Sequence, residues 1–259
     1  PKGQKVIANS ALKTTYNQGD QDVHIFEPTK PISTYLLAIA SGPFDILETQ
    51  IEKNSLRESP IKLTGVATKG KGKKLEFALK QTPKILEKLE EYFGIAYPYD
   101  KLHVIAVPDF SAGAMENVGA ITFRERYLLL DHQSPVDQMK GFYIVMAHEL
   151  AHQWFGNLVT MEWWDDLWLN ESFAEWASHF AQEEIRAMGH ERPDPWATFC
   201  NSRKTWAYRQ DQLPSTHPIA ADMVDLDSVR VNFDGITYAK GASALRQLVA
   251  WVGEDEFLA

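Results

Sequence analysis

Two histidines and a glutamate lie close together in the segment His148-Glu149-Leu150-Ala151-His152. The segment has the form H-E-x-x-H, in which two imidazoles four residues apart project from one face of a helix and can share one cation. Such a motif also arises by chance in about one sequence in a hundred of this histidine content. The spacing therefore predicts a pair of metal ligands, with Glu149 as a carboxylate beside the metal.

The apolar residues around this motif predict which side of the helix is buried. An apolar stripe recurs at helical spacing, and it consists of Tyr143, Ala147, Leu150 and Trp154. The opposite side carries His148, Glu149 and His152, together with Val145 and Gly156. We expect the stripe to face the core and the histidines to face a cleft. The alternative is a pair of hydrogen-bonded histidines on a helix surface.

A third ligand is needed, because catalytic zinc sites usually have three protein ligands and an open position for water. Glu171 is the best candidate, and Asp165 and Asp166 are alternatives that we interpret as charges at a helix N-terminus. In the helix that follows, Phe173, Trp176 and Phe180 form a core stripe, and the other face holds Glu171, Glu175, Ser178 and Gln182. The absence of cysteine from this cluster favours the open, catalytic type of zinc site.

Glu175 lies one helical turn after Glu171. From that position it could accept the second ring N–H of a ligand histidine and fix the tautomer of that ring. A carboxylate on a solvated helix face is the alternative.

The elements that position these residues change along the chain. Strands and turns are predicted in residues 1–50, with strands at Val23–Phe26 and Tyr35–Ile39. A helix is predicted from Leu75 to Phe93, with Pro83 as a kink or start and Gly94 as a stop. Further strands are expected at 102–107 and 120–130, and helices at 137–155, 166–188, 195–208 and 238–252. Strands first and helices later predict an α+β fold.

Composition limits the classes of partner. The 26 Lys and Arg residues face 35 Asp and Glu residues, giving a net charge of −9. This charge argues against nucleic acid as a partner, and no stretch reaches the roughly 18 apolar residues of a membrane span. Cys200, the single cysteine, excludes an internal disulfide and is expected to be a small core residue. We expect a cytoplasmic location, although an upstream targeting segment could precede a chain that lacks an initiator Met.

Three motifs in order resemble the M1 aminopeptidase family, a group of gluzincins. They are the H-E-x-x-H segment, Glu171 in Asn170-Glu171-Ser172-Phe173-Ala174, and Gly113-Ala114-Met115-Glu116-Asn117, which matches the G-A-M-E-N signature of exopeptidases. The resemblance spans nearly the whole chain, from the Ser33-Thr34-Tyr35-Leu36 segment to Tyr238-Ala239-Lys240-Gly241.

The resemblance implies a fold and a domain order. Residues 1–43 would be the last strands of an N-terminal β domain, and residues 44–259 would be a thermolysin-like catalytic domain truncated at its C-terminal end. Most of the β domain, with an additional acidic residue of the amine pocket, and a helical C-terminal domain would lie outside this sequence. The implied cofactor is one Zn²⁺ per chain, held by His148, His152 and Glu171.

The resemblance also implies roles for single residues. Glu149 would be the general base, which takes a proton from the water that zinc activates and returns it to the leaving amine. Tyr238 would donate a hydrogen bond to the oxyanion of the tetrahedral intermediate, whereas its position alone favours a buried aromatic at a helix start.

Substrate binding would fall to Gly113, Ala114, Met115, Glu116 and Asn117. The Glu116 carboxylate would pair with the free α-ammonium group of a peptide. Gly113 and Ala114 are small enough for the backbone to pair with the substrate as an added strand. Met115 could line the first side-chain pocket or belong to the core, and a glycine-containing turn is the alternative for the run.

The predicted function is therefore zinc-dependent removal of N-terminal residues from peptides that have a free N-terminus. One alternative is a catalytically impaired fragment or peptide-binding homologue of the same fold. Two others are an endopeptidase and the leukotriene-hydrolase branch of the family, which usually has Gly in place of Ala114.

Overall fold

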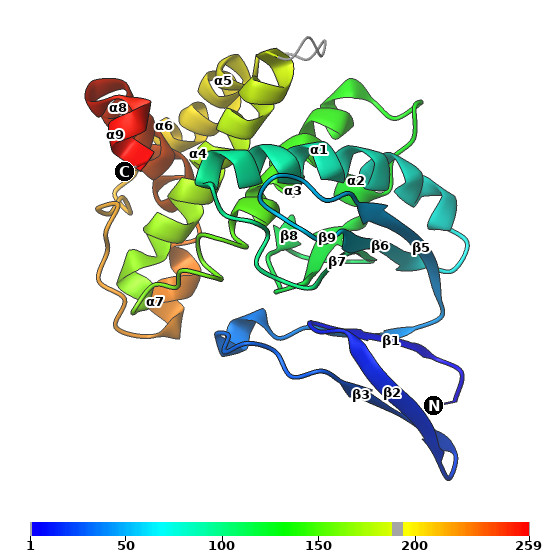
Figure 1. Ribbon diagram of the computed structural model, residues 1–259. Coiled ribbons are helices and arrows are strands. Elements are labelled where there is room, and N and C mark those ends of the chain that lie inside the picture. Colours follow the sequence, from blue (N-terminus) through cyan, green and yellow to red (C-terminus); the bar gives the residue numbers. More distant parts are fainter. Residues whose placement is uncertain (1, 188–193, 259) are drawn as a thin grey trace. The chain divides into compact units, whose positions relative to one another are not determined.

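The structure is a computed structural model that describes residues 2–187 and 194–258. The chain divides into two compact units, Pro1–Gln153 and Trp154–Ala259. The first unit contains all the strands of the described residues, and the second is helical (Figure 1). This mixture of helices and sheets confirms the α+β class.

A five-stranded sheet forms the centre of the first unit, in the order β5-β6-β7-β9-β8. Its strands are β5 (Phe44–Ile51), β6 (Ile61–Thr68), β7 (Lys101–Val107), β8 (Ala114–Met115) and β9 (Ala120–Arg124). Strands β6, β7 and β9 run parallel, and the outer pairs β5·β6 and β8·β9 are antiparallel. The two-residue strand β8 therefore lies at an edge of the sheet.

Helices cover one face of this sheet, as Figure 1 shows for α1 (Glu76–Phe93) and α3 (Val136–Ala151). A 3₁₀ turn, η2 (Gly72–Leu75), precedes α1, and the short helix α2 (Glu125–Leu128) follows β9 directly. The predicted stop of α1 is confirmed, because Gly94 takes the left-handed conformation at φ 63° that suits a residue without Cβ. Pro83 lies inside α1, so it is not the helix start.

The other face of the sheet packs against the N-terminal residues. Ile7 of strand β1 (Lys5–Ala8) forms a buried cluster with Val66, Ile105 and Ala120 from three strands of the sheet. β1 pairs with β4 (Ile39–Gly42), and β2 (Leu12–Gln18) forms a hairpin with β3 (Gln21–Phe26) through a turn at Gly19. The central parallel strands are thus covered on both faces, as such strands usually are.

The second unit is built around one long buried helix, α4 (Leu167–Ala187), which a short turn, η3 (Trp164–Asp166), precedes. The elements after it are α5 (Pro195–Thr198), the π-helix η4 (Phe199–Lys204), α6 (Thr205–Asp211), α7 (Leu226–Val231), the π-helix η5 (Ile236–Lys240), α8 (Gly241–Val252) and α9 (Glu254–Leu258). Helix α4 packs against η5, α8 and α5. The predicted order of helices is confirmed, although Met188 lies outside the described residues.

Two strand predictions were wrong in part. The strand predicted at Tyr35–Ile39 is absent except for its last residue, because Thr34–Leu36 forms the 3₁₀ turn η1, of which only Leu36 is buried, and strand β4 begins at Ile39. The carbonyl of Leu36 accepts hydrogen bonds from the side-chain amides of Asn9 and Asn117, which occupy an acceptor that a strand would use in a ladder.

The strand predicted at 120–130 ends at Arg124, and a helical turn follows. The apolar run Leu128-Leu129-Leu130 is buried in and after that turn, and periodicity cannot separate such a run from a buried strand. The helix predicted to reach Phe155 ends at Ala151. Cys200 was expected in the core, but its position on η4 leaves it exposed.

None of the helices in residues 2–187 and 194–258 has an apolar stretch long enough to cross a lipid bilayer.

Candidate metal centre

His148 lies on the last turn of α3 and His152 is the residue that caps this helix at its C-terminus, and their rings are turned toward one another. The Nε2 atoms of His148 and His152 are 3.1 Å apart, and the ring planes are inclined by 85°. His148 is 9% exposed and His152 is 1% exposed. This burial excludes the alternative of two histidines on a helix surface.

Glu149 lies between the two histidines and is also buried, at 5% exposure. Three residues of the predicted core stripe are buried, since Ala147 and Leu150 are fully buried and Trp154 is 3% exposed, whereas the fourth, Tyr143, is half-buried. The last turn of α3 is therefore enclosed on both sides.

Helix α4 carries the predicted third ligand, Glu171, at 5% exposure. One ring nitrogen of each histidine and one carboxylate oxygen of Glu171 all lie within 4.8 Å of one another. Two nitrogens bound tetrahedrally to one zinc ion at 2.0–2.1 Å would be about 3.3 Å apart, close to the observed 3.1 Å. Two imidazoles and a carboxylate are a donor set that zinc accepts, so these residues fit the ion.

The core stripe predicted for α4 is confirmed by ring contacts. Trp176 stacks on Phe180 with ring centroids 5.5 Å apart, and it touches Phe173 at 5.6 Å. The face that carries Glu171 is buried as well, since Glu175, Ser178 and Gln182 are all less than 10% exposed. A solvated face for Glu175 is thereby excluded.

The carboxylate of Glu175 accepts two hydrogen bonds from Arg203, from Nε at 2.6 Å and from an Nη at 2.8 Å. Arg203 lies on the π-helix η4, and its guanidinium is 4.7 Å from the Trp206 ring centre. Arg203 was not predicted from the sequence, because nothing in the spacing of residues 195–208 relates it to Glu175. A basic residue on a predicted helix is too common to serve as a signal.

The segment Gly113–Asn117 runs along the edge strand β8 of the sheet. Ala114 and Met115 pair with Phe123 and Thr122 of β9, and the carbonyl of Gly113 accepts the amide of Arg124 at 2.9 Å. Because β8 ends the sheet, its second edge has no neighbouring strand within the described part of the chain.

The end of this segment is held by buried amide groups. The backbone carbonyl of Glu116 accepts a hydrogen bond from Gln153 Nε2 at 3.0 Å, and Glu116 itself is 7% exposed. Asn117 donates to the Leu36 carbonyl and accepts from the Thr122 hydroxyl at 3.0 Å. The backbone beside Glu116 is therefore fixed from several directions.

Met115 borders an apolar cavity of about 650 Å³ on the first unit. Its other lining residues include Ile39, Val107, Phe110 and Asn117. The cavity lies beside the face of the sheet that packs on β1 and β4.

Tyr238 lies in the π-helix η5 and is half-buried. Its ring faces the guanidinium of Arg203 at 5.9 Å and the ring of Trp206 at 6.1 Å. π-helical turns are rare and occur frequently at functional sites. The predicted helix start at Tyr238 thus falls inside an irregular turn that begins two residues earlier.

The turn that carries Tyr238 is fastened to α4 next to Glu171. The hydroxyl of Ser172 donates to the Thr237 carbonyl at 2.6 Å. Gly241, which begins α8, allows this approach, because a Cβ there would overlap the Ser172 hydroxyl and lie 2.8 Å from Ser172 Cβ. The neighbours of Glu171 and Tyr238 are therefore in direct contact.

Comparison with known proteins places these motifs in context. The sequence profile of the peptidase family M1 domain matches residues 77–259. Aminopeptidase N of Streptomyces lividans is 47% identical over 99% of this chain and 29% of its own length. Leucyl aminopeptidase of Saccharolobus solfataricus is 43% identical over 99% of this chain and 31% of its own length. Aminopeptidase 2, mitochondrial, of Saccharomyces cerevisiae is 39% identical over 97% of this chain and 25% of its own length. The chain thus spans a quarter to a third of the length of these relatives.

Proposed function

This chain belongs to peptidase family M1, and on that premise we propose that it is the catalytic part of a zinc-dependent aminopeptidase. The observation that carries the proposal is the convergence of ligand atoms from His148, His152 and Glu171 to within 4.8 Å. The names of the relatives, which are aminopeptidases of bacterial, archaeal and yeast origin, support the reaction class.

His148, His152 and Glu171 would hold the ion, since their donor types and spacing fit zinc. A bound zinc ion supplies Lewis-acid chemistry, which lowers the pKa of water to about 7 and polarises a carbonyl. Glu149 would accept the proton of the attacking water on its carboxylate and then deliver it to the leaving amine. The burial of Glu149 supports this role, because bulk water has little access to its carboxylate and therefore does not compete for the proton that it carries.

We propose that Tyr238 donates its phenolic proton in a hydrogen bond to the oxyanion of the tetrahedral intermediate. A donor that is fixed before the reaction stabilises the developing charge without reorganisation. The fastening of its turn by Ser172 supports such a fixed position. Glu175, bound by Arg203, could orient a ligand histidine.

The substrate would be a peptide with a free N-terminus. Glu116 would pair with the α-ammonium group, because a buried carboxylate strongly favours a cationic partner and rejects an acylated one. The unpaired edge of β8 supports binding of the peptide backbone at Gly113 and Ala114 as an added strand. Met115 would contribute apolar surface near the first side chain, and Asn117 would hold the backbone beside Glu116.

The domain boundaries are proposals as well. Residues 1–43 would end an N-terminal β domain, and residues 44–259 would begin a thermolysin-like catalytic domain. The chain's share of its relatives, 29–31% for the bacterial and archaeal ones, supports further domains in the whole protein. We propose a cytoplasmic location because the single cysteine is compatible with a reducing compartment.

Hydrolysis of aminoacyl chromogenic substrates by the full-length, zinc-supplemented protein tests this function. We expect cleavage of the free aminoacyl compounds and none of their N-acetylated counterparts. Internal cleavage of N-acetylated peptides, with no cleavage of aminoacyl substrates, would replace the proposal by an endopeptidase. If the protein retains zinc and binds peptides but cleaves neither class, it is the peptide-binding homologue. If it retains no zinc after reconstitution, the metal site itself is refuted.

A further inference from the structure

The turn that carries Tyr238 begins at a buried carboxylate, Asp234, which is 6% exposed. One of its oxygens, Oδ1, accepts the amides of Ile236 and Thr237 at 2.9 and 3.0 Å. The backbone carbonyl of Asp234 accepts the amide of Tyr238 at 3.0 Å. Asp234 therefore accepts three successive amides at the start of η5. Its side chain binds the first two, which a helix N-terminus leaves without intrahelical partners, and its carbonyl accepts the third in a bond of the i→i−4 helical type.

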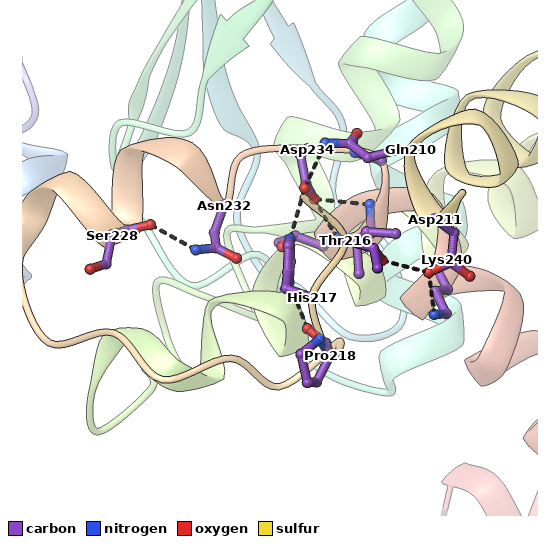
Figure 2. A network of polar contacts seen from close by, with 12 residues as sticks. Gln210, Asp211, Thr216, His217, Pro218, Ser228, Asn232, Asp234 and Lys240 are labelled. Carbon is purple, nitrogen blue, oxygen red and sulfur yellow. Dashed lines mark hydrogen bonds and ion pairs between the residues drawn. The ribbon is translucent and has the colours of Figure 1, made fainter. Parts of the chain in front are cut away.

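The second oxygen of Asp234 is held by two side chains, as Figure 2 shows. Oδ2 accepts Gln210 Nε2 at 2.8 Å and His217 Nε2 at 2.7 Å. Gln210 also accepts the amide of Gly235 at 2.8 Å through its Oε1, so it binds both the carboxylate and the backbone next to it. The four N–H groups on this carboxylate fill the roughly four acceptor sites that a carboxylate has.

His217 lies in the loop between α6 and α7 and connects this loop to the Asp234 carboxylate. Its Nδ1 lies 2.7 Å from the Pro218 carbonyl, and its Nε2 faces Asp234. Both partners are acceptors, and a ring N–H at Nε2 donates to the Asp234 carboxylate. The pair is largely enclosed, with side-chain exposures of 19% for His217 and 8% for Asp234. A charged hydrogen bond in such surroundings is stronger than one in water.

A neighbouring aspartate in the same network shows a different arrangement. Asp211 accepts the Lys240 ammonium and the Thr216 hydroxyl, both at 2.8 Å (Figure 2). Its side chain is 37% exposed, and within residues 2–187 and 194–258 it accepts no hydrogen bond from a backbone amide of η5. Both aspartates thus join the same elements, but only Asp234 binds the amides around Tyr238.

We infer that Asp234 is a positioning residue for Tyr238, and that His217 and Gln210 hold its carboxylate in the orientation that fixes the Tyr238 turn. This inference rests on the proposed role of Tyr238 as the oxyanion donor. A shift of a positioned donor by about 1 Å can reduce a reaction rate by about 100-fold. Loss of this network should therefore reduce transition-state binding and leave ground-state binding nearly intact.

Kinetics of the full-length enzyme with an aminoacyl chromogenic substrate test the inference. Asp234→Asn replaces one carboxylate oxygen by an N–H₂ donor. That donor would face either the N–H groups of Gln210 and His217 or the two backbone amides, and none of these can accept a hydrogen bond from it. We expect kcat to fall about 10- to 100-fold with KM changed by less than about twofold. The affinity for a phosphinic dipeptide, a mimic of the tetrahedral intermediate, should fall by the same factor as kcat/KM. Asp211→Asn is the matched control and should leave all three values nearly unchanged.

A second set of variants separates positioning from folding. His217→Ala should lower kcat, and His217→Gln, which can still donate to Asp234, should recover most of the loss. In a Tyr238→Phe background, Asp234→Asn should cause little further loss, because the residue acts through the tyrosine hydroxyl.

An equal loss caused by Asp234→Asn in the wild-type and Tyr238→Phe enzymes would overturn the inference. If Asp234→Asn lowers thermal stability but leaves kcat unchanged, the inference is overturned too, because Asp234 would then only cap the helix and stabilise the fold. These results differ from a failure of the proposed function, in which the wild type cleaves no aminoacyl substrate or Tyr238→Phe retains the full kcat. The latter outcome would remove the donor role and this inference together.

Discussion

The guanidinium of Arg203 donates hydrogen bonds to both carboxylate oxygens of Glu175, at 2.6 and 2.8 Å. Glu175 is buried, and Nδ1 of His179 lies 3.9 Å from one of its oxygens. The same guanidinium lies 5.9 Å from the centre of the Tyr238 ring. One cation therefore links helix α4, which carries Glu171, to the turn that carries Tyr238. Planar, two-point binding of this kind requires arginine rather than lysine.

Replacing Arg203 should destabilise the protein, because it leaves the Glu175 carboxylate buried without its bidentate cation. Breaking a buried ion pair costs about 3–5 kcal/mol of stability. Because the Arg203 side chain is 29% exposed, we expect Arg203→Met to lower the free energy of unfolding by about 3 kcal/mol, at the lower end of that range. Arg203→Lys should recover part of it. Denaturant unfolding measures these free energies.

A matched control lies on the same helix α4. Arg186 also binds a carboxylate with two nitrogens, at 2.6 and 3.1 Å from Glu183, but both side chains are about one-third exposed. Arg186→Met should therefore cost less than about 1 kcal/mol. Equal losses in Arg203→Met and Arg186→Met would show that burial of Glu175 adds nothing.

Glu149→Gln should abolish turnover while leaving the fold intact. Gln is close to Glu in size and cannot accept the proton, so we expect kcat to fall by about 10²–10⁴-fold or more. Zinc content and the unfolding midpoint should stay near their wild-type values. Asp137→Asn, on the exposed first turn of the same helix α3, serves as the control and should retain full activity. Retention of most activity in Glu149→Gln would assign the proton transfer to another group.

Gly241→Ala should destabilise the protein. At an exposed helical position the same change usually stabilises a protein by roughly 1 kcal/mol, so the expected sign is reversed here. The added Cβ would overlap the hydroxyl of Ser172, so α8 must move or Ser172 must give up its bond to Thr237. Overpacking of this kind costs about 1–3 kcal/mol. Calorimetry of the single variant and of the double variant with Ser172→Ala measures the effect. The double variant should be less destabilised than the sum of the two single changes, and simple additivity would refute the contact.

Much of the fold could be predicted because the helices and strands have strong periodic signals. The helix from Glu76 to Phe93 and the strand from Lys101 to Val107 were found almost to the residue, since Gly94 and Pro108 mark their ends. Two segments were misread as strands, the one at Tyr35–Ile39 before β4 begins and the one at 125–130, which ends in the apolar run Leu128-Leu129-Leu130. In both cases a turn buries only some of the residues, and the partners that decide this, such as Asn9 and Asn117 on Leu36, come from distant parts of the sequence.

The residues of the candidate site also fall into two groups, those that a local pattern could predict and those that it could not. H-E-x-x-H is a local pattern on one helix, so His148 and His152 could be paired from spacing alone. The convergence of Glu171 with that pair was expected from the ligand count of catalytic zinc, and Tyr238 and Glu116 came from the family resemblance alone. Arg203, His217 and Asp234 could not be found, because their roles depend on contacts across 17 to 28 residues between helices and loops. No periodicity encodes such contacts.

A buried lysine in the first unit gives a prediction about pH. Lys101 is 6% exposed in β7, and its Nζ lies 3.0 Å from the Ala8 carbonyl, 2.7 Å from the Gly119 carbonyl and 3.3 Å from His103 Nδ1. Burial lowers the pKa of Lys101 to about 7. Burial, helped by the charges of Lys101 and Lys62, lowers the pKa of His103 to about 3. A neutral amine can donate to both carbonyls and accept the N–H of His103, so deprotonation loses none of these contacts.

Stability should therefore rise with pH above 7 through Lys101. Between pH 7 and 10.5 the unfolded chain holds this proton and the folded chain does not, so the free energy of unfolding increases by up to roughly 1.4 kcal/mol per pH unit. His103 is neutral in both states in this range and adds nothing. Lys101→Met removes the slope. The loss of the amine as a donor to the Ala8 and Gly119 carbonyls adds only a cost that does not change with pH, and the Gly119 carbonyl keeps the amide of His103 as a donor. Lys62, its exposed register partner on β6, gives the control Lys62→Met, which should keep the wild-type slope. Denaturant unfolding at pH 7, 8 and 9 measures the slopes, and equal slopes for wild type and Lys101→Met would mean that Lys101 stays charged in the folded protein.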